Sequence, residues 1–188
     1  MSRFSVEIVK EKRKTISVGI TPDGNVIVKA PIYTKEKYIN DFLDEKESWI
    51  IKNVERNKRR QKKLKDIEIL SKKEIEELYE SARDIIPLRC GLYSKIIGVD
   101  YHNITIRSQK TRWGSCSSRG NLNFNIALML VPKEILDYVI VHELCHRKEM
   151  NHSDAFWNEV CKILPDYKER RKWLKNNGDE AMVKLGII

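Results

Sequence analysis

The sequence contains no run of apolar residues long enough to cross a membrane. A spanning helix needs about 20 predominantly apolar residues, and charged residues, which make up 34% of the chain, interrupt every apolar stretch before that length. The first residues also have no apolar segment typical of a signal peptide, because Arg3 and Glu7 interrupt it. These absences predict a cytoplasmic protein without membrane contact.

Paired metal-binding cysteines and a glycine-rich phosphate loop are absent as well. The four cysteines form no Cys-X-X-Cys pair, which argues against a zinc site built from thiolates and against a disulfide framework. Reduced thiols agree with the cytoplasmic location. The missing phosphate loop removes the commonest sequence signal for nucleotide binding. The cysteines are Cys90, Cys116, Cys145 and Cys161.

Positive charge is what the chain has in excess, with a formal net charge of +9. Such a charge favours association with polyanions but says nothing about chemistry. Its densest stretch, Arg56 to Lys65, has seven basic residues and no acidic one. We interpret this stretch first as a solvated helix end or linker, with nucleic-acid phosphate contact as the alternative. No aromatic residue interleaves it, so base stacking has no support.

Short alternating segments predict strands near the N-terminus. Pro22-Asp23-Gly24-Asn25 is a hairpin turn signal, because Asp and Gly accept the positive φ that such turns need. Pro31 ends the strand run. Residues 1–32 are therefore predicted to form a strand-rich N-terminal lobe. Its strands are expected at residues 4–9, 15–20 and 26–30.

Helical periodicity begins after this lobe. A first helix is predicted from about Thr34, whose hydroxyl is expected to cap it, into the basic stretch, so that residues 33–70 form a helix and a basic linker. Ser71 is expected to cap a second helix that stops near Pro87. Residues 71–188 are predicted to be the core domain. Its further elements are strands at 101–107 and 122–130, a polar loop at 114–120, a helix opened by Pro132, and helices at 153–164 and 166–177, the last stopped by Gly178.

The helix that Pro132 opens ends in an HExxH motif, His142-Glu143-Leu144-Cys145-His146. Four residues are slightly more than one helical turn, so His142 and His146 project from one face and can share a metal ion. Glu143 points away from the direction in which the two histidines project, so its carboxylate is expected near a water molecule bound to the ion and not as a ligand. This pattern predicts a zinc-dependent hydrolase with Glu143 as the catalytic base. The alternative is two histidines satisfied by hydrogen bonds.

His152 is the candidate for a third ligand. A catalytic zinc takes three protein ligands and keeps a fourth position open. His152 is too far along the chain to share the face of His146 on an unbroken helix, but Asn151 tolerates the left-handed conformation that ends helices. Ser153 is then expected to cap the next helix. The fourth histidine, His102, lies in a predicted strand, where we interpret it as structural.

Four sequence blocks together resemble the YgjP-like family of metal-dependent hydrolases, which is related to the SprT and WLM zinc peptidases. The resemblance implies an α+β fold, with a zincin-like core in which the HExxH helix lies beside a short antiparallel sheet, and Zn²⁺ on His142, His146 and His152. It also assigns Arg112, Trp113 and Ser115 to the substrate cleft, although packing is the expected role of Trp113. Arg112 and Ser115 are candidate donors to a developing oxyanion. The blocks are Lys110–Ser117, Gly120–Asn125, Val139–His146 and Asn151–Trp157.

Three functions agree with these residues. The first is a metallopeptidase that acts on peptides or proteins. The second is a metal-dependent pyrophosphohydrolase of nucleoside triphosphates, an activity that has been attached to this family and that the net charge favours slightly. The third is a nucleic-acid-associated accessory protein with a structural zinc. Only three good ligands are present, which argues against a fully coordinated structural ion.

Overall fold

The computed structural model describes residues 5–188, which form five α-helices, one 3₁₀ helix and six strands. The predicted α+β class is confirmed. The chain divides into two compact units, Met1–Asp66 and Ile67–Ile188. Among residues 5–188, no helix combines the length and apolar character that a membrane span requires. The cytoplasmic location stays a prediction.

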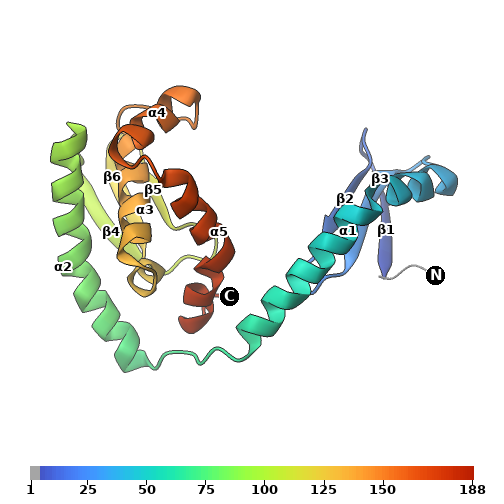
Figure 1. Ribbon diagram of the computed structural model, residues 1–188, viewed down its shortest axis with the longest axis horizontal. Coiled ribbons are helices and arrows are strands. Elements are labelled where there is room, and N and C mark those ends of the chain that lie inside the picture. The colour runs from blue at the N-terminus through green and yellow to red at the C-terminus, as the bar shows by residue number, and fades with distance from the viewer. Residues whose placement is uncertain (1–4) are drawn as a thin grey trace. The chain divides into compact units, whose positions relative to one another are not determined.

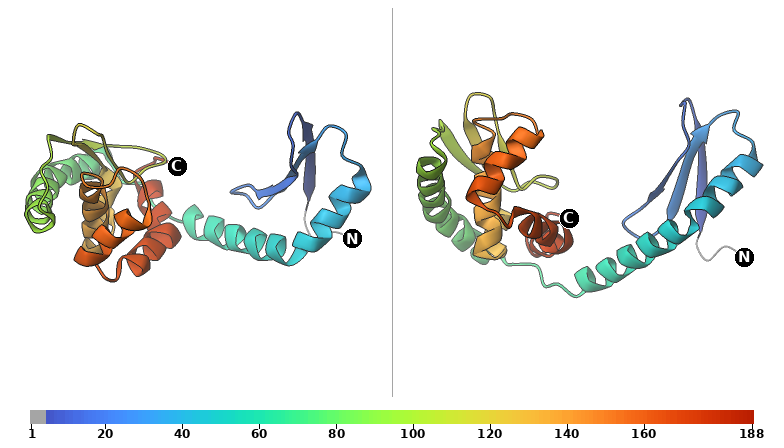
Figure 2. Two further views of the ribbon diagram at one scale, coloured as in Figure 1. Left: turned by 90° about the horizontal axis from the view of Figure 1, so that it is seen from above. Right: turned by 45° about the horizontal axis from the view of Figure 1, so that its top comes forward.

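The N-terminal unit is a three-stranded sheet with helix α1 packed against it (Figures 1 and 2). The predicted turn is confirmed, with Gly24 at φ 86° between two antiparallel strands. Phe4, with which the first predicted strand begins, lies outside the described residues. The strands run in the order β1-β3-β2, with β1 parallel to β3. They are β1 (Val6–Glu11), β2 (Ser17–Ile20) and β3 (Val26–Pro31).

Helix α1 (Glu36–Lys65) contains the basic stretch in its C-terminal turns. Ile39, Ile50 and Val54 are buried against the sheet, as the apolar spacing predicts. The predicted Thr34 cap is wrong, because Lys35 occupies the N-cap position and makes no side-chain cap bond. The packed apolar face therefore holds the helix start without a cap.

The second unit has its own three-stranded sheet, in the order β4-β6-β5. The predicted antiparallel sheet is wrong, because β6 is parallel to β4 and antiparallel to β5. β4 and β5 flank β6 and run in opposite directions, since the loop between them crosses the end of β6. Part of the predicted polar loop is strand β5. The strands are β4 (Asn103–Arg107), β5 (Gly114–Cys116) and β6 (Asn121–Asn125).

Asn125 explains why β6 is shorter than the predicted strand 122–130. Its Oδ1 accepts from Ala127 N at 3.1 Å, which turns the chain into the 3₁₀ helix η1 (Ile126–Leu130). Its Nδ2 donates to the carbonyl oxygens of Gln109 and Arg112, at 2.7 and 2.8 Å. One buried side chain therefore ends the strand and fixes the loop that leads into β5.

Helix α3 (Lys133–Cys145) lies at the centre of this unit, between α2 and α5 (Figure 1). It also contacts β5, so almost every turn of it is buried. A helix that is apolar all round needs such a position. The other helices are α2 (Lys72–Ile97), α4 (Asp154–Ile163) and α5 (Tyr167–Lys184).

Helix α2 begins as predicted but does not stop at Pro87. Ser71 and Glu74 form a capping box. The helix continues through Pro87 to Gly98, which ends it with φ 75°. Ile86 and Cys90, on either side of the proline, are fully buried in the core. Their packing offsets the hydrogen bond that proline removes.

Gly178 was expected to end the last helix, but α5 continues through it. It is buried inside α5, where an added Cβ would overlap Cζ2 of Trp113. We therefore expect Gly178→Ala to destabilise the protein by about 1–3 kcal/mol through overpacking. Gly91→Ala, at a helix position with nothing within 4 Å, is the control and should be neutral or slightly stabilising. Chemical unfolding of both variants measures the difference, and equal effects would contradict the Trp113 contact.

Candidate metal centre

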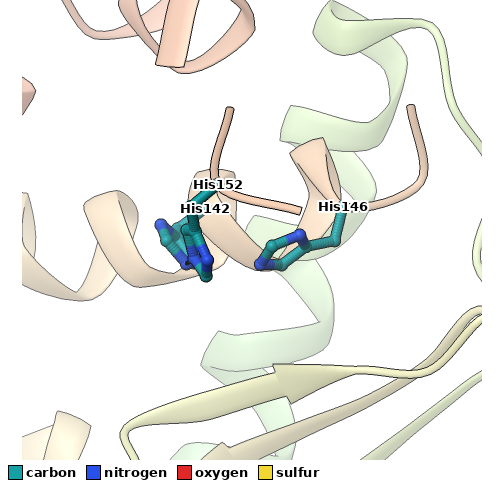
Figure 3. A group of neighbouring side chains, drawn as sticks. All are labelled: His142, His146 and His152. Atoms are coloured by element: carbon teal, nitrogen blue, oxygen red, sulfur yellow. Dashed lines mark hydrogen bonds between the residues drawn. The ribbon is translucent and has the colours of Figure 1, made fainter. Parts of the chain in front are cut away.

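Three histidines converge in the second unit, as the HExxH spacing and the turn after it predict. His142 and His146 come from α3, and His152 from the segment before α4. One nitrogen from each ring lies within 4.8 Å of the others. Nε2 of His142 and Nε2 of His152 are 2.9 Å apart. Figure 3 shows these two rings close together and the ring of His146 turned towards them.

The turn that returns His152 is built differently from the prediction. Among residues 5–188 every positive φ belongs to a glycine. The predicted left-handed conformation of Asn151 is therefore wrong. Asn151 instead accepts a hydrogen bond from Ser153 N through its side-chain oxygen, at 3.1 Å. Ser153 is the N-cap residue of α4 by position, without a side-chain cap bond. An Asn side chain that closes a local turn gives the same change of direction.

A backbone carbonyl fixes the tautomer of His146. Nδ1 of this ring lies 3.0 Å from the carbonyl oxygen of Glu149. A carbonyl only accepts, so Nδ1 carries a proton, and in the neutral ring Nε2 is then the unprotonated nitrogen. An imidazole held in this way presents a lone pair to a metal ion.

The environment keeps two of the rings neutral. Burial, with smaller contributions from the neighbouring histidines, lowers the pKa of His142 to about 3. Burial also lowers the pKa of His146. Phe156 contributes to this burial, since its ring stacks on His146 at 4.5 Å and meets His142 edge-on at 4.8 Å. Neutral imidazole is the form that binds a metal.

His142 has a nitrogen that the protein leaves unsatisfied. Its Nδ1 is buried, and no atom of the described residues forms a hydrogen bond with it. Its Nε2 lies 2.9 Å from Nε2 of His152. Three convergent imidazoles are a donor set that suits a divalent metal ion.

Glu143 lies beside the histidines in a buried position, with 6% of its surface exposed. Burial raises the pKa of its carboxyl to about 8, and the positive charge of Arg112 opposes this shift. The side chain lies against Gly114 of β5, where an added Cβ would be 2.8 Å from both Cγ and Oε1 of Glu143. The edge of β5 thus sets the position of the carboxyl group.

This burial should make the metal-free protein less stable as the pH rises. Between pH 4.5 and about 8 the folded Glu143 carboxyl binds a proton that the unfolded chain has lost, so stability falls with rising pH. Glu143→Gln removes this dependence. We expect the free energy of unfolding of the variant to increase relative to that of wild type, by on the order of 4 kcal/mol over that range. Urea unfolding without metal measures it, and a pH-independent difference would contradict the burial.

The other predicted site residues lie around β5. Arg112 is exposed in the preceding loop, and its positive charge acts to lower the pKa of Glu143. Ser115 lies on β5 itself and accepts a hydrogen bond from Asn123 at 3.2 Å. Trp113 packs against the core and Gly178. The basic stretch Arg56 to Lys65 belongs to the other unit.

Gly114, Phe156 and Trp157 were not predicted to shape the site. The ring of Trp157 lies 5.6 Å from the rings of both His142 and His152. The one available signal was the Phe-Trp pair one helical turn after His152, which the chain brings back onto the histidines. The contact of Gly114 with Glu143 could not be predicted from the sequence, because it depends on how β5 packs against α3.

Comparison with known proteins identifies a family and a curated relative. Residues 14–78 and 68–177, together most of the chain, match the YgjP-like family, metallopeptidase domain. A UTP pyrophosphatase of Escherichia coli (strain K12) is 26% identical over 98 residues, which are 49% of this chain and 59% of that protein. The chain therefore spans about three fifths of the length of this curated relative.

Two solved structures are similar over about half of the chain. The metallopeptidase zymogen of Pyrococcus abyssi abylysin is 27% identical, covers 48% of this chain and 94% of its own, and has a TM-score of 0.44. The metallopeptidase zymogen of Methanocaldococcus jannaschii jannalysin is 25% identical, covers 48% of this chain and 93% of its own, and has a TM-score of 0.43. The family match over residues 14–177 extends well beyond both. By that match, the chain belongs to the YgjP-like family and carries its metallopeptidase domain.

Proposed function

We propose that the chain is a zinc-dependent hydrolase with a zincin-like core, in which His142, His146 and His152 hold the ion and Glu143 is the catalytic base. Family membership makes it a metal-dependent hydrolase. The observation that carries the finer proposal is the convergence of three imidazole nitrogens within 4.8 Å of one another. Three nitrogen ligands suit zinc and leave a fourth coordination position for the reaction, which supports a catalytic ion over a structural one.

Each residue then has a defined task. A bound zinc would polarise a carbonyl or phosphoryl oxygen and lower the pKa of a water molecule to about 7. Glu143 takes the proton from the attacking water and returns it to the leaving group, and a carboxyl pKa raised to about 8 suits both transfers. Arg112, whose charge acts on Glu143, is the candidate to stabilise negative charge that develops on the substrate. Phe156 limits water around the histidines.

A peptide bond is the first candidate for the bond that is cleaved. The family is described as a metallopeptidase domain. Strand β5 also supports this candidate, because in residues 5–188 it pairs with β6 alone and its Gly114 touches Glu143. An extended peptide can add to such a strand edge through main-chain hydrogen bonds, which would lay a scissile carbonyl beside the base.

A phosphoanhydride bond is the second candidate. The relative that shares 98 aligned residues is named for its action on UTP. The same donor set and base can activate water for attack on phosphorus. Basic side chains beside the histidines, described below, favour this candidate.

A parallel assay separates the two. Unfolded protein, short peptides and nucleoside triphosphates are offered to wild type and to Glu143→Gln, each with and without DNA. We expect wild type to cleave one substrate class and the variant to cleave none. Stimulation by DNA that is lost when the lysines and arginines of Arg56–Lys65 are neutralised would support a nucleic-acid contact there. Cleavage of triphosphates alone would favour phosphoanhydride hydrolysis. No cleavage of any substrate class would contradict the proposed hydrolase.

A further inference from the structure

Helix α5 carries four basic side chains on one face beside the metal centre. They recur at steps of three and four residues, so they form one stripe along the helix. With Trp157 and Tyr167 they line a pocket of about 380 Å³, which is within the size range of small-molecule sites. We call this the α5 pocket. Its basic residues are Lys168, Arg171, Lys172 and Lys175.

The charges of this stripe are not neutralised within residues 5–188. Arg170, on another face of α5, forms an ion pair with Asp166 at 2.9 Å and also donates to the carbonyl of Glu134. None of the four basic residues of the α5 pocket forms an ion pair with a carboxylate of the described chain. Four unpaired cations around one concave surface produce a positive potential that attracts anions.

Trp157 connects the α5 pocket to the metal centre. Its ring lies 5.6 Å from the rings of His142 and His152. The guanidinium of Arg171 lies over the same ring, 4.7 Å from its centre. Arg171 and the two histidines therefore lie against the same indole ring.

Trp157 itself is not available as a stacking platform for a base. Tyr167 stacks on it, with ring centres 5.2 Å apart and planes 13° from parallel, and Arg171 covers it as well. The pocket therefore offers charge to a ligand and little to distinguish one base from another. Phosphate groups fit this chemistry, because arginine and lysine bind phosphate oxygens through charge-assisted hydrogen bonds.

We propose that the α5 pocket is a phosphate-binding subsite that holds the phosphate chain of a nucleoside triphosphate, with the reacting end directed at the metal centre. The stripe spans about 10 Å along the helix, enough for several phosphate groups to meet separate cations. This proposal rests on the metal centre proposed above, but not on a peptide bond being cleaved. If it holds, phosphoanhydride hydrolysis becomes the better supported of the two candidate reactions.

The test is a calorimetric titration of the metal-loaded full chain with the Glu143→Gln change, which prevents turnover. UTP, ATP and inorganic tripolyphosphate should bind with affinities within about threefold of one another, and uridine should not bind. The variant Lys168→Gln/Lys172→Gln/Lys175→Gln should bind all three phosphates at least about tenfold more weakly, since each lost charge-assisted contact weakens binding severalfold.

A matched control removes the same charge elsewhere in the second unit. Lys72→Gln/Lys133→Gln/Lys184→Gln neutralises three exposed lysines outside the pocket and should leave phosphate binding unchanged. Metal content and thermal unfolding are measured on both triple variants. A Glu143→Gln protein that takes up no zinc but still binds tripolyphosphate would count against the metal centre and not against the pocket.

Three results would overturn the subsite. The first is that the Glu143→Gln protein with all its lysines does not bind tripolyphosphate. The second is that both triple variants weaken this binding equally, which would indicate general electrostatic attraction only. The third result is binding of a single-stranded oligothymidylate that depends on the three pocket lysines while tripolyphosphate does not bind. That outcome would make this face a nucleic-acid surface instead.

Discussion

Replacing Glu143 with glutamine is expected to lower kcat by about 10³-fold, within the range that a general base contributes, and to leave the metal content unchanged. Glutamine has the same shape, so it should keep its place against Gly114. It cannot accept the proton of the attacking water. Turnover of the substrate class found in the parallel assay, measured with bound zinc, gives both quantities from one preparation.

The alternative outcomes have different meanings. If turnover falls together with zinc content, Glu143 supports the ion instead of acting as a base. Unchanged turnover with normal zinc would remove Glu143 from the mechanism altogether. Glu143→Asp is a useful companion, because it keeps the carboxylate but withdraws it by one methylene from the position that β5 sets. We expect it to retain part of the activity.

The second large effect should follow from Gly114→Ala. The backbone of Gly114 does not have a positive φ, so alanine is tolerated by the main chain. Its Cβ, however, would lie 2.8 Å from Cγ and Oε1 of Glu143. The buried carboxyl must therefore move by a fraction of an ångström or more, and a misplaced catalytic group can cost about 10²-fold in rate. Zinc content should not change.

Gly19→Ala is the matched control for this variant. Gly19 is also a strand glycine, in β2, and the nearest atom to an added Cβ is 4.0 Å away. It should leave both activity and zinc content unchanged. If Gly114→Ala retains full activity, Glu143 does not depend on the edge of β5 for its position. The folded state of both variants is checked by thermal unfolding.

The histidines could be found from the sequence because their arrangement depends mainly on local geometry. The α-helical period places His142 and His146 on one face, and a turn within a few residues returns His152. The Ser71 cap and the Gly24 turn could be predicted for the same reason. Each is a short motif whose conformation is set by its own side chains.

Features that depend on tertiary packing could not be predicted from local sequence patterns. Pro87 and Gly178 have low helix propensity, yet each lies inside a helix whose neighbouring residues are buried. Asn125 ends β6 through contacts with a loop that precedes it by many residues. The mixed sheet follows from how that loop crosses β6, which no local pattern encodes.

The residues around the metal centre could not be predicted from the sequence for a related reason. Arg171 and Trp157 meet only because α5 folds back beside α4, and the sequence separates Arg171 from Glu143 by 28 positions. A stripe of lysines on a helix is by itself most often a solvated face. It becomes a candidate subsite only when the fold sets it beside the histidines.

The central claim is that His142, His146 and His152 bind one zinc ion, and metal analysis of protein purified without added metal tests it most directly. We expect about one equivalent of zinc in wild type and in Glu143→Gln, and less than about a tenth of an equivalent in His146→Ala, because losing one of three ligands sharply lowers affinity. His102→Ala, which changes the exposed fourth histidine, should retain the metal. Wild-type protein without bound metal that also fails to take up added zinc would contradict the account.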